Sequence, residues 1–117
     1  MVKLQTGLGT VRIAGDVFTY LAGDAASNCF GVKGMAIRSV ADGLVHLLKR
    51  ESMGKGVLVT FSDDGSISVE LHIAVDRGVN IPVICDSIKS EVRYKVTRAT
   101  DVAIRRVDVF VDSIIVG

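Results

Sequence analysis

The sequence has no tryptophan and one proline, and aromatic residues make up only 5% of its 117 residues. So few rings leave little material for the stacking platforms that bind single-stranded nucleic acid. The formal net charge of +1 provides no overall field toward a polyanion or an anionic lipid. Uninterrupted runs of 18 apolar residues are absent, and the opening residues contain no apolar leader. We therefore expect a cytoplasmic protein with no membrane span.

The chain also lacks the residue spacings of a metal site. Cys29 and Cys85 are far apart and form no C-x-x-C pair, and His46 and His72 add no zinc-binding spacing to them. Each cysteine falls within an apolar helical pattern, where a reduced thiol is typically buried in the core. We therefore predict two buried free thiols, no metal ion and no cofactor.

The composition that remains is that of one globular domain spanning residues 1–117. Hydrophobic residues make up 49% of the chain and charged residues 23%. A chain of this length buries roughly two thirds of its unfolded surface, which is enough for a core without disulfide or metal crosslinks. We expect it to fold without a partner domain.

Hydrophobic periodicity predicts the elements, because alternation favours strands and a helical repeat favours helices. The predicted order is β-α-β-(short α)-β-β-α-β. Asp16 and Asp42 are expected to cap the first two helices, and Asn80 the third, with Pro82 in its first turn. Strands are predicted at 9–14, 32–38, 57–61, 67–76 and 107–112, and helices at 16–29, 40–52 and 80–99.

The clearest pattern is a hairpin whose turn contains Asp64 and Gly65, a pair that supplies the positive φ of a tight turn. In its second strand, alternate residues are apolar and are expected to face a core: Ile67, Val69, Leu71, Ile73 and Val75. The residues between them are expected to face solvent: Ser68, Glu70, His72, Ala74 and Asp76. One face of the sheet is therefore predicted to be buried and the other wet.

These elements predict an α+β fold: a two-layer sandwich of a mixed, mostly antiparallel sheet with the two main helices on one face. Such an arrangement leaves the opposite face and at least one strand edge uncovered. Phe110 lies on that face, and the final strand ends in the apolar run Ile114-Ile115-Val116. We expect a homo-oligomer that covers them, the alternative being a monomer with a frayed end.

Three other patterns favour ordinary structure over a ligand site. Gly7-Leu8-Gly9 lacks the third glycine and the following helix of a dinucleotide-binding loop. Gly31-Val32-Lys33-Gly34 matches the G-x-x-G loop of RNA-binding KH domains, but a strand is predicted after it instead of a helix. Glu70 and His72 share one strand face and could form an acid/base pair, yet exposed sheet positions produce the same pattern. We predict no catalytic residue.

One local concentration of positive charge lies late in the second long helix and just after it. A solvated helix end, favoured by the helix dipole, explains most of it, and a docking surface for an acidic partner is the alternative. The candidate interaction surface consists of Lys89, Arg93, Lys95, Arg98, Arg105, Arg106 and, on the final strand, Phe110.

Several segments together resemble the alkaline shock protein family, also called the envelope stress response family, of Gram-positive and related bacteria. The most specific is a helix followed by Gly-Val-x-Gly-Met at residues 21–36, and residues 42–51, 55–59, 67–76 and 107–111 carry the rest. The resemblance covers nearly the whole chain and is closest to the short members that consist of this domain alone.

The resemblance implies a cytoplasmic, non-enzymatic interaction module linked to envelope or alkaline stress. Some members are held near the membrane by a separate membrane-embedded partner. No catalytic residue is established for the family, so none is carried over. The charged N-terminal extension and C-terminal tail of longer members are missing here, so recruitment through them is not expected. The alternative function is a nucleic-acid-binding domain that uses the basic end of the second long helix and Gly31–Gly34.

Overall fold

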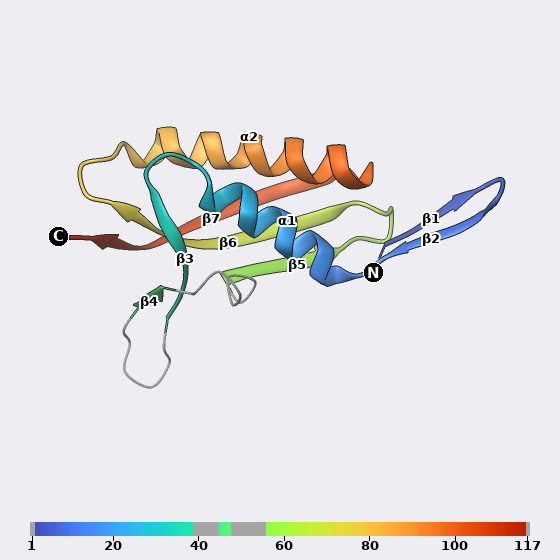
Figure 1. Cartoon of the computed structure of the whole chain (residues 1–117), viewed down its shortest axis with the longest axis horizontal. Helices are drawn as coiled ribbons and strands as arrows, with labels where there is room; N and C mark the ends of the chain where they lie inside the picture. The colour runs from blue at the N-terminus through green and yellow to red at the C-terminus, as the bar shows by residue number, and fades with distance from the viewer. Residues whose placement is uncertain (1, 39–44, 48–55, 117) are drawn as a thin grey trace.

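The computed structural model describes residues 2–38, 45–47 and 56–116 (Figure 1). The α+β class and the order of the main elements agree with the sequence-based expectation. The described elements are β1 (Val2–Thr6), β2 (Gly9–Ile13), α1 (Gly15–Ser27), β3 (Val32–Arg38), β4 (Val45–Leu47), β5 (Val57–Phe61), β6 (Ile67–Asp76), α2 (Ile81–Thr100) and β7 (Ile104–Ile115).

One apolar cluster joins both helices to one face of the main sheet, so that the helices form one layer and the sheet the other. Burial of an aliphatic or aromatic side chain of this size stabilises the fold by about 1.5–3 kcal/mol relative to exposure. The inward residues are Phe18, Ala22 and Ala26 from α1, Ile84, Ile88, Val92 and Val96 from α2, and Ile67, Val69, Leu71, Ile73 and Val75 from β6.

Strand β6 is the centre of the sheet because it pairs with three other strands. Along one edge, β5 pairs antiparallel with its first half and β3 pairs antiparallel with its last residues. Along the other edge, β7 pairs in parallel from Ile104 to Ile115, after the crossover through α2 that a parallel pair requires. Strand β4 adds to β3 at the far side. The sheet is therefore mixed and mostly antiparallel, as predicted.

Gly56 lies at the point where β3 and β5 meet along their shared edge of β6. A Cβ atom there would be 3.0 Å from the carbonyl oxygen of Ala36 and 3.3 Å from that of His72. Both obstacles are backbone atoms, which cannot rotate away as the end of a side chain can. The close approach of the two strands therefore favours a glycine, since a Cβ atom would push the backbone atoms apart by a few tenths of an ångström.

The sequence predicts one strand near the N-terminus, whereas the structure has two. Residues 9–13 do form a strand, but it is the second strand of a hairpin with β1 and turns at Gly7 and Leu8. The hairpin, residues 2–13, extends away from the sandwich and forms a separate two-stranded sheet (Figure 1). We refer to it as the arm. The alternation in Val2-Lys3-Leu4 is the available signal, and it is too short to indicate a strand by itself.

The prediction of a helix at 40–52 is wrong for residues 45–47. Residues Val45–Leu47 form β4, which pairs antiparallel with Ala36–Arg38 of β3. The other residues of the predicted helix, with its cap Asp42, lie outside the described residues. Val45-His46-Leu47 alternates in polarity, and pairing with a neighbouring strand outweighs the helical spacing of the surrounding leucines.

The two long helices begin differently. Helix α1 starts at Gly15 after Ala14, and no side chain caps it, so Asp16 is a first-turn acidic residue and not the predicted cap. Helix α2 begins as predicted, because the Asn80 side chain accepts a hydrogen bond of 3.1 Å from the Val83 amide. It ends at Asp101, whose φ of 59° is the left-handed conformation that stops many helices.

Cys29 and Cys85 are free thiols, as predicted, but both are only partly buried, so the expectation of core positions is wrong. Cys29 packs against the edge of the core cluster, but helix α1 ends at Ser27, two residues before it, and the side chain stays partly exposed. Cys85 follows Ile84, which belongs to the buried stripe of α2, and one helical step turns it to the side of the stripe.

Candidate interaction surface

The side of the sheet opposite the helices is not covered by a second layer of described elements. Strand register places the side chains on it, because Glu70 stands opposite Leu58 of β5 and Asp108 of β7, and His72 stands opposite Phe110. We call this surface the open sheet face and define it by Leu58, Glu70, His72, Arg106, Asp108, Phe110 and Asp112.

Alternation places Ala74 on the side of β6 opposite the helices, but the side chain is not exposed there. Its side chain is completely buried. Ala74 has neighbours on both edges, Gly34 of β3 and Ser113 of β7, and each pairing has a register shift beside it. The alternation of β6 itself continues, because Ile73 and Val75 both lie in the core cluster, but the predicted exposure of Ala74 is wrong.

His72 is held from three directions on the open sheet face. Its Nδ1 lies 2.9 Å from Asp112 Oδ2, and its Nε2 lies 3.0 Å from Glu70 Oε2. The imidazole ring stacks on Phe110, with ring centroids 4.8 Å apart and planes at 11°. An imidazolium donates from both nitrogens, so the two carboxylates are both satisfied when His72 is protonated.

The protonation of His72 follows from this arrangement. Burial of the ring acts to lower the pKa of His72, but the hydrogen bonds and the negative charges of Glu70 and Asp112 outweigh it and raise that pKa above its ordinary value. A general base needs a ring nitrogen within reach of substrate, and here both nitrogens are occupied. Glu70 and His72 do make contact, and their arrangement holds a rigid ring in place.

A shallow groove of about 290 Å³ lies beside this network, lined by Leu58, Thr60, Ser68, Val69, Glu70, Arg106 and Asp108. Within this lining, Arg106 Nη2 donates to Asp108 Oδ1 at 3.1 Å. Both side chains are exposed, so this pair contributes at most about 1 kcal/mol. The face carries three carboxylates, Glu70, Asp108 and Asp112, and one guanidinium, and is therefore acidic while His72 is neutral.

Two of the predicted basic residues serve the fold itself. Lys95 Nζ contacts Asp24 Oδ2 at 2.6 Å and so links α2 to α1, and this hydrogen bond raises the pKa of Lys95. Arg93 Nη1 donates to the carbonyl oxygen of Ile104 at 2.9 Å, which connects α2 to the start of β7. Neither cation is presented as a free group to a partner.

The remaining predicted surface residues are not gathered in one place. Lys89 and Arg98 are exposed on α2, where Arg98 donates to the hydroxyl of Tyr94 and lies over its ring at 5.7 Å. Arg105 is exposed near the start of β7, and Arg106 belongs to the open sheet face with Phe110, which is 44% exposed. The sequence-based grouping therefore divides among a helix, a strand end and a sheet face.

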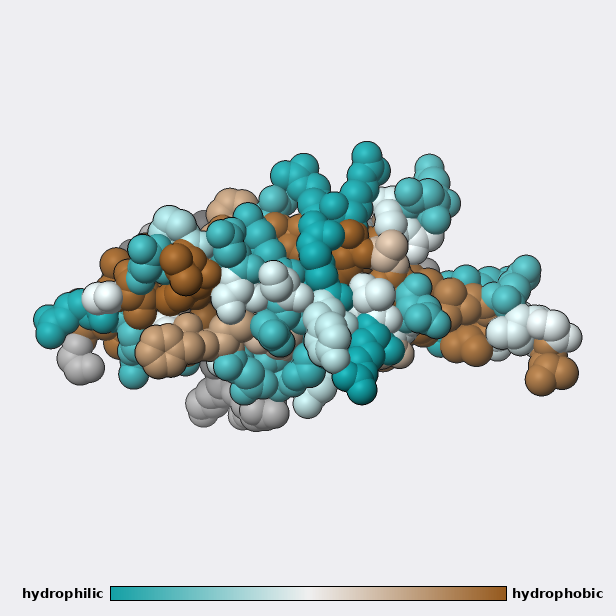
Figure 2. Space-filling view, turned by 90° about the horizontal axis from the view of Figure 1, so that it is seen from above, coloured by the Kyte–Doolittle hydropathy of each residue, from teal (hydrophilic) through white to brown (hydrophobic). Residues whose placement is uncertain are grey.

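Sequence reasoning missed an apolar surface where the turn after α1 and the start of α2 meet the loop after β6. A cavity of about 470 Å³ opens there, lined by Phe30, Asp76, Arg77, Gly78, Val79, Asn80, Val83 and Ile84. Phe30 is 93% exposed. Figure 2 shows hydrophobic surface over the start of α2, at the end of the molecule away from the arm. The available signal is a phenylalanine in a turn directly before Gly31.

In residues 2–38, 45–47 and 56–116, no three histidine, cysteine or acidic side chains are placed together to hold a metal ion. In the same residues, no helix has both the length and the apolar character to cross a membrane.

Comparison with known proteins identifies relatives over almost the full length. The model of the alkaline shock protein family, described as having a cell envelope-related function, matches residues 3–116. Uncharacterised protein YloU of Bacillus subtilis is 29% identical over 114 residues, covering 97% of this chain and 94% of YloU. Uncharacterised protein Spy1614 of Streptococcus pyogenes is 33% identical over 97% of this chain and 93% of its own length. Uncharacterised protein YqhY of B. subtilis is 34% identical over 92% and 78%. No solved structure gives a significant match.

Proposed function

This chain belongs to the alkaline shock protein family, which is described as having a cell envelope-related function, and on that premise we propose that it is a non-enzymatic interaction module. It acts through protein–protein contacts in the cytoplasm, at the inner face of the cell membrane, where a membrane-associated protein partner holds it. The family description supports the link to the envelope, and the open sheet face supports the mode of action.

The single observation that carries the proposal is the rigid recognition element on the open sheet face. His72 is fixed between Glu70 and Asp112 and supports the ring of Phe110 by stacking. An aromatic anchor surrounded by polar side chains is the usual composition of a protein interface. Leu58, 57% exposed, adds a second apolar group beside the groove.

The alternative function, nucleic-acid binding through the basic helix end, has less support. Lys95 and Arg93 are engaged by Asp24 and by the Ile104 carbonyl group, so fewer cations remain to follow a phosphate backbone. A titration of labelled RNA and DNA at rising salt tests this alternative. Tight binding that weakens steeply with salt would replace the proposed function with a nucleic-acid one.

The proposed function is tested by photo-crosslinking in cells. A photoreactive phenylalanine analogue replaces Leu58 on the open sheet face or, as the matched control, exposed Tyr94 on α2. We expect protein adducts from position 58 and few from position 94, with the partner identified by mass spectrometry. Equal adduct yields at both positions, or none at position 58, would contradict an interaction through the open sheet face.

A further inference from the structure

Strand β7 has a long free edge. It pairs with β6 on one side, and among the described strands none pairs with its other side. An unpaired edge exposes a row of amide and carbonyl groups that can accept another strand. Val109 and Val111, on the core side of this edge, are only partly buried, whereas their partners on β6, Leu71 and Ile73, are 0% exposed.

The available part of this edge has a defined length. At its start, Arg93 already donates to the carbonyl oxygen of Ile104. Register shifts follow on both sides of a regular stretch, in which Ser68 to Ile73 pair without interruption with Arg106 to Val111. Residues 106–111 are therefore the segment where a further strand would find regular geometry.

The arm is a two-stranded hairpin that would be stabilised by pairing with a further strand. Strands β1 and β2 pair only with each other among the described strands, and an isolated two-stranded hairpin is at best marginally stable in water. The base of β1 lies beside the turn between β5 and β6, where Val2 and Lys3 line a small cavity with Phe61. Strand β2, Gly9–Ile13, is exposed except for Ile13, and Leu8 at the tip is fully exposed.

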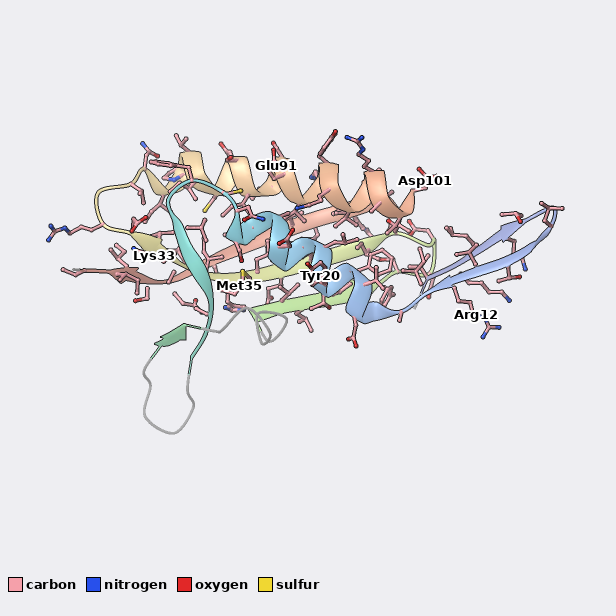
Figure 3. All side chains as sticks on the ribbon, viewed as in Figure 1. Arg12, Tyr20, Lys33, Met35, Glu91 and Asp101 are labelled. Atoms are coloured by element: carbon pink, nitrogen blue, oxygen red, sulfur yellow. The ribbon has the colours of Figure 1, made fainter. Side chains whose placement is uncertain are left out.

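Each face of the arm matches one face of the β7 edge. Lys3 stands opposite Arg12 on one side of the arm, and Leu4 stands opposite Val11 on the other. Figure 3 shows Arg12 pointing away from the body of the molecule. The first 15 residues contain no acidic residue, so the charged side chains of the arm are all basic.

Strand β7 has the complementary alternation. On the open sheet face its edge presents Asp108 and Asp112, next to Glu70 of β6, together with Arg106, which is paired with Asp108, so the acidic groups are in excess; on the core side it presents half-buried valines. A strand added to this edge would place Arg12 beside Asp108 and Val11 beside the valines. Charge and apolar surface are thus satisfied together, on opposite faces of one extended sheet.

We propose that strand β2 of one copy of this chain pairs with the β7 edge of a second copy, over residues 106–111. The inference rests on the proposed protein–protein function and deepens it by naming one partner, a second copy. Five residues of β2 fit the regular stretch from Arg106 to Val111. Arm and edge are different surfaces, so the contact is heterologous and joins copies into rings or open chains, or closes a pair by exchange of arms.

A charge reversal on each side tests the contact by sedimentation velocity at tens of micromolar protein. We expect the wild type to associate, and Arg12→Glu and Asp108→Lys each to raise the dissociation constant roughly tenfold or more. The double variant carrying both reversals, and an equimolar mixture of the two single variants, should regain association. Arg77→Glu, which reverses an exposed charge in the loop after β6, is the matched control and should associate like the wild type.

Hydrogen exchange supplies a second measurement, which does not depend on the variants' oligomer size. Amides of residues 104–112 should be more protected in associated wild type than in Arg12→Glu, and urea midpoints will verify that both chains are folded. A monomeric wild type would overturn the inference and leave the crosslinking test of the proposed function unaffected. The inference would also be overturned if Arg12→Glu associated as strongly as the wild type, a result that would favour copies paired through two β7 edges. A mixture of the two single variants that is folded but stays monomeric would overturn it as well.

Discussion

The two faces of β6 differ in what holds them. On the covered face, Ile67, Leu71 and Ile73 are completely buried under α1 and α2 and contribute through the removal of apolar surface from water. On the open sheet face, Glu70 and His72 of the same strand remain partly exposed and are held by hydrogen bonds to each other and to Asp112. Apolar burial contributes a large free energy and has no preferred direction. The hydrogen bonds of the open sheet face contribute little free energy and depend on the positions of individual atoms.

Within β6, the covered face therefore determines stability, and the open sheet face is expected to determine binding. Substitutions on the covered face are expected to change the free energy of unfolding, and substitutions on the open sheet face to change binding with little loss of stability. The following measurements compare the two faces, beginning with the largest expected effect.

Leu71→Ala on the covered face should destabilise the protein by about 2–5 kcal/mol, because it leaves a cavity beneath the helices. Leu58→Ala removes the same atoms from the open sheet face, where the side chain is 57% exposed, and should change stability by only about 0.5 kcal/mol. Urea unfolding followed by circular dichroism measures both. Similar losses for the two variants would show that the open face is covered in solution.

Gly31→Ala should also be strongly destabilising. Gly31 has a φ of +88°, and a Cβ atom there would lie 2.5 Å from Ile84 Cδ1 on the covered side. Gly65 has the same φ, but its added Cβ would meet nothing within 4 Å. Gly65→Ala should therefore cost only the backbone strain, about 1–2 kcal/mol, and Gly31→Ala about 1–3 kcal/mol more from overpacking. Equal unfolding free energies would mean that Ile84 moves aside without cost.

The open sheet face should make stability depend on pH through His72. Burial acts to lower its pKa, but Glu70 and Asp112 raise it on balance in the folded state, so folding favours the protonated ring. That contribution is complete below the ordinary histidine pKa, about 6.5, and is lost as pH rises through the folded-state value. The stability difference between wild type and His72→Gln should therefore be larger at about pH 5.5 than at about pH 9. An NMR titration that gives His72 a lowered pKa would contradict this.

The cysteines at the margin of the covered face should show the smallest effect. Burial raises the pKa of Cys29, with a further rise from the Glu91 carboxylate, and burial raises the pKa of Cys85 against the opposing charge of Lys89. Because the thiolate is the reactive form, both should react with iodoacetamide at neutral pH more slowly than in the urea-unfolded chain. Reaction at the unfolded rate in the native protein would show that these thiols are exposed and unperturbed.

The covered face is predictable because each of its signals is local. Alternation through Ile67 to Val75, the Asp64-Gly65 turn and the Asn80 cap each follow from residues within a few positions of one another. Helix α2 and the class of the fold follow from the same kind of pattern.

The open face and the arm depend on contacts that sequence spacing does not reveal. Asp112 reaches His72 across 40 positions, and only the β6–β7 register brings them together. Lys95 binds Asp24, 71 positions away in the sequence. It is therefore not part of the basic surface that the neighbouring lysine and arginine residues predict. The three residues of β4 lie among leucines at helical spacing, and they form a strand through pairing with β3.

The parallel pairing of β6 with β7 has a consequence for synthesis on the ribosome. Strand β6 is translated before α2 and β7, so one edge of the central strand has no partner while those residues are still being made. Translation adds about 5–20 residues per second, which leaves the nascent sheet incomplete for seconds. During that interval the covered face also lacks α2, and its valines and isoleucines are open to other nascent chains. Chaperone binding should therefore be greatest on ribosome-bound chains that end between β6 and β7.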